Sequence, residues 1–179
     1  MLLDKLATFK RAGIVSKCFV ISSDLNALRE AEKLGANGIP EPRDMGVNSA
    51  VSYGRDRLSD KDEFMVVPAD LPLLRKQEIT AALSLGKLFD CVISPSRYFN
   101  GTNLLIFSRR KAVGLSYDAN SFWNHIKEGA RRRLTLAVYT GAGVLFDVDT
   151  VDDLNELARA PINRRSVQFA ERALARWAS

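Results

Sequence analysis

The sequence predicts an α/β domain in which helices flank a Rossmann-like, mostly parallel sheet. Its 179 residues, 46% apolar and 26% charged, suit one globular domain with a sizeable core. Short β-rich runs alternate with helical patterns of about 10 to 15 residues, which is typical of βαβ units. The run at 64–68 is apolar throughout, as in a strand that is buried on both faces of a parallel sheet. We expect residues 1–160 to form this domain and residues 161–179 a C-terminal helix.

The first half of the chain is predicted to alternate between helix and strand. Apolar side chains at helical spacing predict an opening helix, which Gly13 ends. Asp24 is a typical helix N-cap and Gly35 a typical residue after a helix, so they predict a helix between them. The other elements predicted here are strands at 15–22, 36–40 and 64–68, a loop at 41–46 and a helix at 48–58.

The second half continues this alternation. Asp149 or Thr150 stands where a helix N-cap is expected, ahead of a helix that runs to residue 160. The other predicted elements are helices at 76–85, 120–129 and 167–177 and strands at 89–94, 102–107 and 134–139.

The charge pattern favours small anions over nucleic acid as partners. The net charge is +5, and short basic clusters lie at 109–111, 131–133 and 164–165. A nucleic-acid surface would interleave basic with aromatic side chains on one element, whereas these clusters are scattered over loops and helix ends.

Nothing in the composition predicts a membrane or secreted protein. No apolar run reaches the roughly 18 residues of a membrane span, and Asp4 and Lys5 interrupt the N-terminal apolar run, unlike a secretory signal. Cys18 and Cys91 sit in apolar runs, so both are expected to be buried thiols, and a disulfide is not needed in a domain of this size. We therefore expect a cytoplasmic protein.

Asp70 is the first candidate for chemistry, because ligands of parallel sheets bind beyond the carboxyl ends of the strands. It ends the run 64–70, so its carboxylate is expected at the edge of a central strand. Mg²⁺ prefers a few carboxylates together with substrate phosphate oxygens. The alternative is that Asp70 is a turn or N-cap residue before Pro72.

Asp147 and Asp149 are the second candidates, because the segment FDVDT is predicted to end a strand and precede a helix. Strand alternation points their side chains to opposite sides, so only one is expected to face the same cleft as Asp70. The other is expected to cap the helix or orient its neighbours. Carboxylates from two strand ends predict a divalent-metal site that holds a nucleotide triphosphate.

Two further segments carry candidate anion ligands. Thr102 and Asn103, in NGTN, offer a hydroxyl and an amide to a phosphate or carboxylate, although a plain turn before a strand has the same pattern. Ser121 is a candidate N-cap whose helix start also binds an anion. His125, the only histidine, has no serine or cysteine partner arranged for nucleophilic chemistry, so a structural role is expected for it.

Gly46 and Asn48, in GVNSA, start a helix after a loop. They are candidates for contact with a base or phosphate, although a helix start needs no ligand.

Five motifs in this order carry a family resemblance. They are GVNSAV (46–51), PADLPLL (68–74), PSR followed by GTN (95–97 and 101–103), SF-x-x-H (121–125) and DVDT-x-x-DL (147–154). Over roughly residues 1–158 the sequence resembles the 2-phospho-L-lactate guanylyltransferases of deazaflavin coenzyme (coenzyme factor 420) biosynthesis. These belong to the molybdenum-cofactor guanylyltransferase-like superfamily. GTN with SF-x-x-H is the specific part, whereas ADLPLL and D-x-D occur more widely among nucleotidyltransferases.

The resemblance implies a nucleotide-diphospho-sugar transferase-like fold and the transfer of GMP from GTP to a three-carbon phospho-acid, with release of pyrophosphate. The acceptor would be 2-phospholactate, phosphoenolpyruvate or 3-phosphoglycerate. By position, Asp70 and Asp149 would hold Mg²⁺, with Asp147 as a third ligand.

The resemblance also implies the remaining binding residues. Gly46 and Asn48 would lie near the nucleotide. Thr102 and Ser121, with Asn103 beside them, would bind the acceptor.

The family begins with a strand and a basic loop that grips the triphosphate, whereas MLLDKL matches the helix that follows them. We therefore expect a sheet without its first strand, whose neighbouring strands either expose their edges or pair with each other. Either the sequence belongs to a longer product, or another chain, such as the second copy in a homodimer, completes the sheet.

Two departures from the family concern the acceptor. Bulky Tyr98 and Phe99 stand where glycines are frequent. Asp118 places an extra carboxylate in the acceptor loop, which would repel an anion unless the metal or Arg97 compensates.

Two other functions remain open at this point. A nucleotide-sugar glycosyltransferase of related fold would use D-x-D to hold Mn²⁺ and a sugar diphosphate. An inactive homologue would bind a nucleotide poorly, or bind only a partner.

Overall fold

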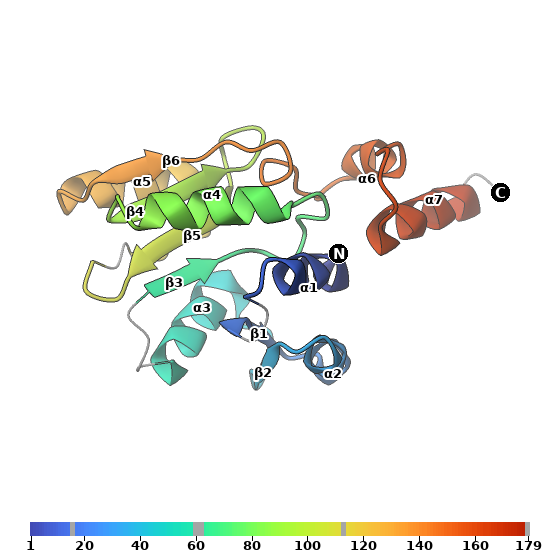
Figure 1. Ribbon diagram of the computed structural model, residues 1–179, viewed down its shortest axis with the longest axis horizontal. Helices are drawn as coiled ribbons and strands as arrows, with labels where there is room; N and C mark the ends of the chain where they lie inside the picture. Colours follow the sequence, from blue (N-terminus) through green and yellow to red (C-terminus); the bar gives the residue numbers. More distant parts are fainter. Residues whose placement is uncertain (15–16, 59–62, 112–113, 178–179) are drawn as a thin grey trace.

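The computed structural model describes residues 1–14, 17–58, 63–111 and 114–177, in which helices surround two β-sheets (Figure 1). The elements in chain order are α1 (Leu2–Arg11), β1 (Phe19–Ser22), α2 (Leu25–Lys33), β2 (Asn37–Pro40), α3 (Gly46–Arg57), β3 (Glu63–Val66), α4 (Lys76–Gly86), β4 (Cys91–Pro95), β5 (Thr102–Ser108), α5 (Ser121–Arg131), β6 (Leu136–Val138), α6 (Val151–Ala158) and α7 (Arg165–Trp177). The predicted alternation of helix and strand is confirmed. Residues 15 and 16 of the strand predicted at 15–22 lie outside the described residues.

Local sequence signals set most helix ends. Asp24 caps α2, since its Oδ1 accepts from the backbone N–H of Asn26 at 2.8 Å. Gly13 and Gly35 follow α1 and α2 with φ of 75° and 93°, a conformation that favours glycine. Of the two caps considered for α6, Thr150 is the observed one.

The sheets are mixed rather than mostly parallel. β1 pairs with β2 in parallel, and the larger sheet has the order β3-β5-β4-β6. In that sheet β4 and β6 are parallel, whereas β5 is antiparallel to both β3 and β4. Residues 96–101 alone join β4 to β5, and a parallel connection needs about a dozen residues or more. The predicted α/β class is confirmed, with this difference in strand direction.

The facing strands of the two sheets, β1 and β3, each keep one edge free and do not pair with each other in the described part of the chain. A groove of about 1070 Å³ lies beside these edges and is lined mainly by apolar side chains of β1, β3, α1 and α3. Of the two arrangements expected for these strands, exposed edges rather than mutual pairing are observed in the described residues.

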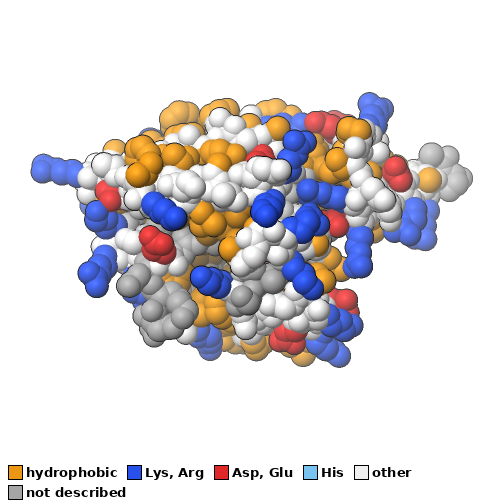
Figure 2. Space-filling model, viewed as in Figure 1, with side chains coloured by type: hydrophobic (Ala, Val, Ile, Leu, Met, Phe, Trp, Pro, Cys, Tyr) orange, Lys and Arg blue, Asp and Glu red, His pale blue; other side chains and the backbone are white. Residues whose placement is uncertain are grey.

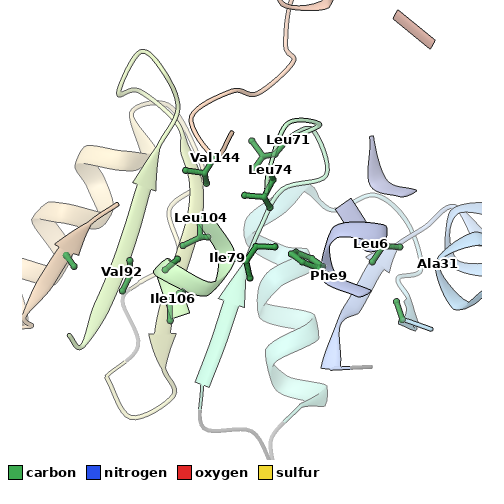
Figure 3. Close-up of a cluster of buried hydrophobic side chains, with 13 residues drawn as sticks. Leu6, Phe9, Ala31, Leu71, Leu74, Ile79, Val92, Leu104, Ile106 and Val144 are labelled. Atoms are coloured by element: carbon green, nitrogen blue, oxygen red, sulfur yellow. The ribbon is translucent and has the colours of Figure 1, made fainter. Parts of the chain in front are cut away.

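The largest buried cluster joins helix α1 to α4 and the larger sheet. Figure 3 shows Phe9 of α1 beside Ile79 of α4, with Leu104 of β5 beyond Ile79 and Leu6 of α1 on the opposite side, toward Ala31. A smaller cluster that includes Phe146, Leu157, Val167 and Ala170 holds α6 and α7 together.

The surface and the thiols match most of the composition-based expectations. Lys and Arg side chains are spread over the face seen in Figure 2 rather than gathered along one element. Among the described helices, none combines the length and apolar character that crossing a membrane requires. Cys91 is a buried free thiol, as predicted, whereas Cys18 is free but only half-buried.

Candidate functional site

Asp147 and Asp149 lie in an irregular segment, residues 139–150, and not at the end of a strand as predicted. The last strand, β6, already ends at Val138, because the chain turns away at 139–145 to reach α4. Strand alternation therefore does not set the directions of the two carboxylates. The pKa of Asp147 is raised, first by burial and then by the negative charges of Asp149 and Asp70, so all three acidic groups lie near one another.

Glu78, on α4, anchors the start of this segment. Its Oε1 accepts from the backbone N–H of Gly143 at 2.7 Å and of Val144 at 3.3 Å. The approach is close enough to require glycine, since a Cβ at position 143 would lie 2.3 Å from the backbone oxygen of Leu73. Asn103 adds a third tie, because its Nδ2 donates to the carbonyl oxygen of Val144 at 2.9 Å.

Asp70 lies in a turn beyond β3 and next to the acidic segment. The backbone N–H of Val148 donates to the carbonyl oxygen of Asp70 at 3.2 Å, so the segment 147–149 runs beside Asp70. The Oδ1 atom of Asp70 is buried and has no hydrogen-bond partner. Burial raises the pKa of Asp70, Lys5 opposes this rise, and the negative charge of Asp149 adds to it.

The chemistry of these carboxylates suits a magnesium site to which other ligands contribute. In the described residues, no three His, Cys, Asp or Glu side chains are grouped closely enough to hold a metal by themselves. Mg²⁺ needs only one or two protein carboxylates when phosphate oxygens and water fill its other positions. The unpaired oxygen of Asp70 and the exposed carboxylate of Asp149 suit that role. Asp147 is partly engaged, because the Asn103 side chain donates to it.

Lys5 is a polar residue of this region that the sequence analysis did not identify as functional. It lies on α1 with 2% of its surface exposed, lines the groove, and its Nζ has no hydrogen-bond partner. Burial lowers the pKa of Lys5 to about 7, and the negative charge of Asp70 opposes this shift. The sequence signal for its burial was its place on the apolar face of the first helix, beside Leu2, Leu6 and Phe9.

Thr102 and Ser121, predicted together as acceptor ligands, do come together. The Oγ of Ser121 donates to the Oγ1 of Thr102 at 3.1 Å, and both residues are buried. His125 is fully buried, and its Nδ1 lies 3.0 Å from the same Oγ1. The ring of His125 therefore contacts the hydroxyl group of Thr102, which in turn contacts that of Ser121. Burial lowers the pKa of His125 to about 4, so the ring is neutral near pH 7.

Ser121 is the first residue of α5 and not its N-cap. The N-cap is Asn120, in the left-handed conformation with φ 61°, and its side chain makes no capping hydrogen bond. The first backbone N–H groups of a helix have no partner within it, so they point out of the helix start beside Thr102.

Asn48 and Gly46 lie at the start of α3, where they were predicted, but the polar atoms of Asn48 are engaged by the chain itself. Its Oδ1 accepts from the backbone N–H of Tyr117 at 2.7 Å, and its Nδ2 donates to Asp118 at 3.1 Å. Asn48 therefore ties α3 to the loop before α5. Gly46 is exposed, with φ 76°.

The residues that differ from the family pattern near the acceptor loop, and Arg97 beside them, contact other parts of the chain. Arg97, expected to compensate Asp118, instead forms ion pairs with Asp153 and Glu156 of α6. Asp118 instead accepts a hydrogen bond from the amide of Asn48, which leaves its negative charge in place. Tyr98 is 74% exposed, and Phe99 packs edge-on against Phe122 at the start of α5.

Curated relatives match most of the chain. A 2-phospho-L-lactate guanylyltransferase of Methanocaldococcus vulcanius is 34% identical over 158 residues, which are 88% of this chain and 71% of the relative. A 3-phospho-D-glycerate guanylyltransferase of Phenylobacterium zucineum is 30% identical, and the match spans 99% of this chain and 84% of the relative. A phosphoenolpyruvate guanylyltransferase of Rubrobacter xylanophilus is 33% identical, with coverage of 82% and 73%.

The solved structures agree on the fold. A crystal structure from Desulfovibrio desulfuricans G20, classed as a nucleotide-diphospho-sugar transferase, superimposes with a TM-score of 0.67 at 16% identity. The match covers 95% of this chain and 82% of that one, and it supports the predicted nucleotide-diphospho-sugar transferase-like fold. The family model described as "Guanylyl transferase CofC like" matches residues 1–172. The chain therefore belongs to the CofC-like guanylyl transferase family.

Proposed function

We propose that the protein transfers GMP from GTP to a three-carbon phospho-acid and releases pyrophosphate, as a step of deazaflavin coenzyme biosynthesis. One observation carries this proposal: Asn103 links an acidic cluster to a cluster of hydroxyl groups. Its amide reaches the carbonyl of Val144 and the carboxylate of Asp147, while Thr102, the preceding residue of β5, contacts Ser121 and His125. A site for a metal-bound triphosphate and a site for an anionic acceptor would then lie side by side.

The chemistry needs no nucleophile from the protein. A phosphate oxygen of the acceptor attacks the α-phosphorus of GTP, the new P–O bond forms, and the bond to the β-phosphate oxygen breaks to release pyrophosphate. Mg²⁺, held by Asp70 and Asp149, would neutralise charge on the phosphates. The remaining catalysis comes from orientation: Thr102 and Ser121 hold the acceptor, and the neighbouring start of α5 favours its negative charge.

The acceptor is one of three candidates, since relatives of similar identity are named for 2-phospho-L-lactate, 3-phospho-D-glycerate and phosphoenolpyruvate. Asp118 is exposed on the loop before α5 and held by Asn48, and its negative charge acts against all three acceptors alike, because each carries one carboxylate and one phosphate group.

The test is a pyrophosphate-release assay with GTP, Mg²⁺ and each of the three acceptors in turn. We expect release with at least one acceptor and none after Asp149→Asn, whereas Asp152→Asn, an exposed change on α6, leaves the rate unchanged. Turnover of UDP- or GDP-sugars in place of GTP would favour the glycosyltransferase alternative. An absence of pyrophosphate release at high Mg²⁺ with every acceptor would favour an inactive homologue.

The free edges of β1 and β3 support a further part of the proposal, that a second copy of the chain covers the groove in a homodimer. Val47 lines the groove and is 49% exposed, while Val151 on α6 lies outside it and is 50% exposed. Light scattering after size exclusion is expected to give a dimer that Val47→Lys dissociates and Val151→Lys does not. A monomeric mass for the unchanged protein would contradict the dimer and leave the reaction untouched.

A further inference from the structure

The hydroxyl groups of Thr102 and Ser121 share one hydrogen bond, which uses only one of their two protons. The Oγ atoms lie 3.1 Å apart, with 4% and 3% of the two residues exposed. A buried hydroxyl proton without an acceptor is unfavourable by about 1–3 kcal/mol. Whether the second proton finds an acceptor depends on His125, the other side chain that contacts Thr102.

The tautomer of His125 follows from its other contact. The Nε2 atom lies 3.0 Å from the backbone nitrogen of Ser116, whose N–H can only donate. Nε2 must therefore carry the lone pair. Because burial keeps this ring neutral near pH 7, its single proton is on Nδ1, which donates to the Oγ1 of Thr102 at 3.0 Å.

The Nδ1–H group of His125 thus donates to the Thr102 oxygen, and the ring provides no acceptor for the proton of Thr102. If Ser121 donates to Thr102, the proton of Thr102 is unused; if Thr102 donates to Ser121, the proton of Ser121 is unused. Either way, one spare donor remains. With the opposite tautomer, Nδ1 would accept the proton of Thr102, Ser121 would donate to Thr102, and no donor would remain for a ligand.

We propose that His125 is a positioning residue, which sets the Thr102–Ser121 pair to donate one hydroxyl proton to an anionic oxygen of the acceptor. The inference rests on the proposed function. It adds a residue, His125, that orients the hydroxyl groups without itself contacting the acceptor. The surroundings are consistent, because the unpaired N–H groups at the start of α5 also favour a phosphate or carboxylate there.

Two conservative variants separate the two contacts of His125. In His125→Asn the side-chain amide nitrogen takes the place of Nδ1, so the donor to Thr102 is kept and the contact with Ser116 is lost. In His125→Gln the amide oxygen takes the place of Nε2, so the contact with Ser116 is kept and the donor is lost. Both variants change the same buried position, which makes each a control for the other.

Steady-state kinetics with GTP and the preferred acceptor then distinguish positioning from a purely structural role. We expect His125→Gln to raise the KM for the acceptor by about ten- to a hundredfold, the effect of one hydrogen bond to a charged group, with the KM for GTP unchanged. His125→Asn should stay within a few-fold of the unchanged protein. In the Thr102→Val background, where the hydroxyl that His125 contacts is gone, His125→Gln should have no further effect. Equal effects of Asn and Gln, or additive effects in the double variant, would overturn the inference.

A second measurement is independent of turnover. A long-range ¹H–¹⁵N NMR spectrum of the full chain reports which ring nitrogen of its only histidine carries the proton. We expect protonation at Nδ1 in the unchanged protein and in Thr102→Val. A ring protonated at Nε2 would overturn the inference, even if the protein released pyrophosphate. If no pyrophosphate were released, a titration with 3-phosphoglycerate would compare affinity in place of KM across the same variants.

Discussion

Two of the ionisable groups that line the groove carry a buried atom without a hydrogen-bond partner among the described residues. They are the Oδ1 atom of Asp70 and the Nζ atom of Lys5. Burial shifts the pKa of each toward its neutral form, upward for Asp70 and down to about 7 for Lys5. Each therefore lowers stability, and replacing it is expected to stabilise the fold.

Asp70→Asn separates stability from function. Because burial raises the pKa of Asp70, its charge is disfavoured in the fold, and we expect the substitution to raise the free energy of unfolding at pH 7. Pyrophosphate release should fall at least a hundredfold, because a carboxylate that would bind Mg²⁺ is gone. Urea unfolding and the release assay measure the two effects, with Asp56→Asn on exposed α3 as the control. Unchanged release would remove Asp70 from the proposed site.

The lowered pKa of Lys5 predicts how the stability of the fold changes with pH. Its pKa is about 7 in the fold and about 10.4 when unfolded, so between pH 7 and 9 the unfolded chain binds more protons. The free energy of unfolding should therefore rise with pH in this window, by roughly 1 kcal/mol per pH unit. Lys5→Met should be more stable at pH 7 and lose this rise, as urea unfolding at pH 7, 8 and 9 would show. Parallel curves for the two proteins would mean that Lys5 keeps its charge in the fold.

At the scale of elements, the irregular segment 139–150 is positioned by contacts with distant parts of the chain. Glu78 of α4, Asn103 of β5 and the carbonyl oxygen of Asp70 each hold one point along it. Its two acidic residues thus take their places from three distant parts of the chain.

Gly143→Ala tests this anchoring. The added Cβ would lie 2.3 Å from the Leu73 oxygen and 2.4 Å from Glu78 Oε2, so the segment must shift. We expect a loss of about 2 kcal/mol in the free energy of unfolding, typical of overpacking, and a fall in pyrophosphate release as Asp149 moves. Gly114→Ala is the matched control, because its Cβ would meet Glu128 at an ordinary 3.5 Å. Similar stability and activity in both variants would contradict the anchoring role.

At the scale of the whole molecule, the C-terminal helix is tied to the first helix. Asp4 on α1 accepts from the backbone N–H of Ser166 at 2.7 Å and from its hydroxyl at 2.6 Å, at the start of α7. Val167 and Ala170 of α7 are buried in the cluster with α6. The boundary predicted at residues 160 and 161 stays a prediction, while these contacts join the two parts physically.

A chain that ends at Ala160 tests the contribution of α7. We expect it to lose roughly 3 kcal/mol in the free energy of unfolding, because the apolar surface under Val167 and Ala170 becomes exposed. Asp4→Asn should cost about 1 kcal/mol, since it weakens the helix cap and keeps the packing. Urea unfolding compares the three proteins. Equal stability of the shortened and complete chains would show that residues 161–179 are an appendage, as the predicted boundary implies.

By itself, the sequence determined the features that depend on neighbouring residues and on residue type. Apart from the strand expected before Asp147, the helices and strands were predicted to within a few residues, because caps such as Asp24 and Gly35 and the periodicity of apolar side chains act locally. The motifs around Asp70, Thr102 and Ser121 were enough to identify the family, since their order along the chain is itself the signal.

Only the tertiary structure decided the features that depend on which distant segments meet. These features are strand direction in the larger sheet, the burial of Lys5 and the two contacts of His125. Each depends on parts of the chain that no local pattern relates. The physical reason is that burial and the choice of hydrogen-bond partners are set by packing, which removes water from some polar groups and brings others within reach.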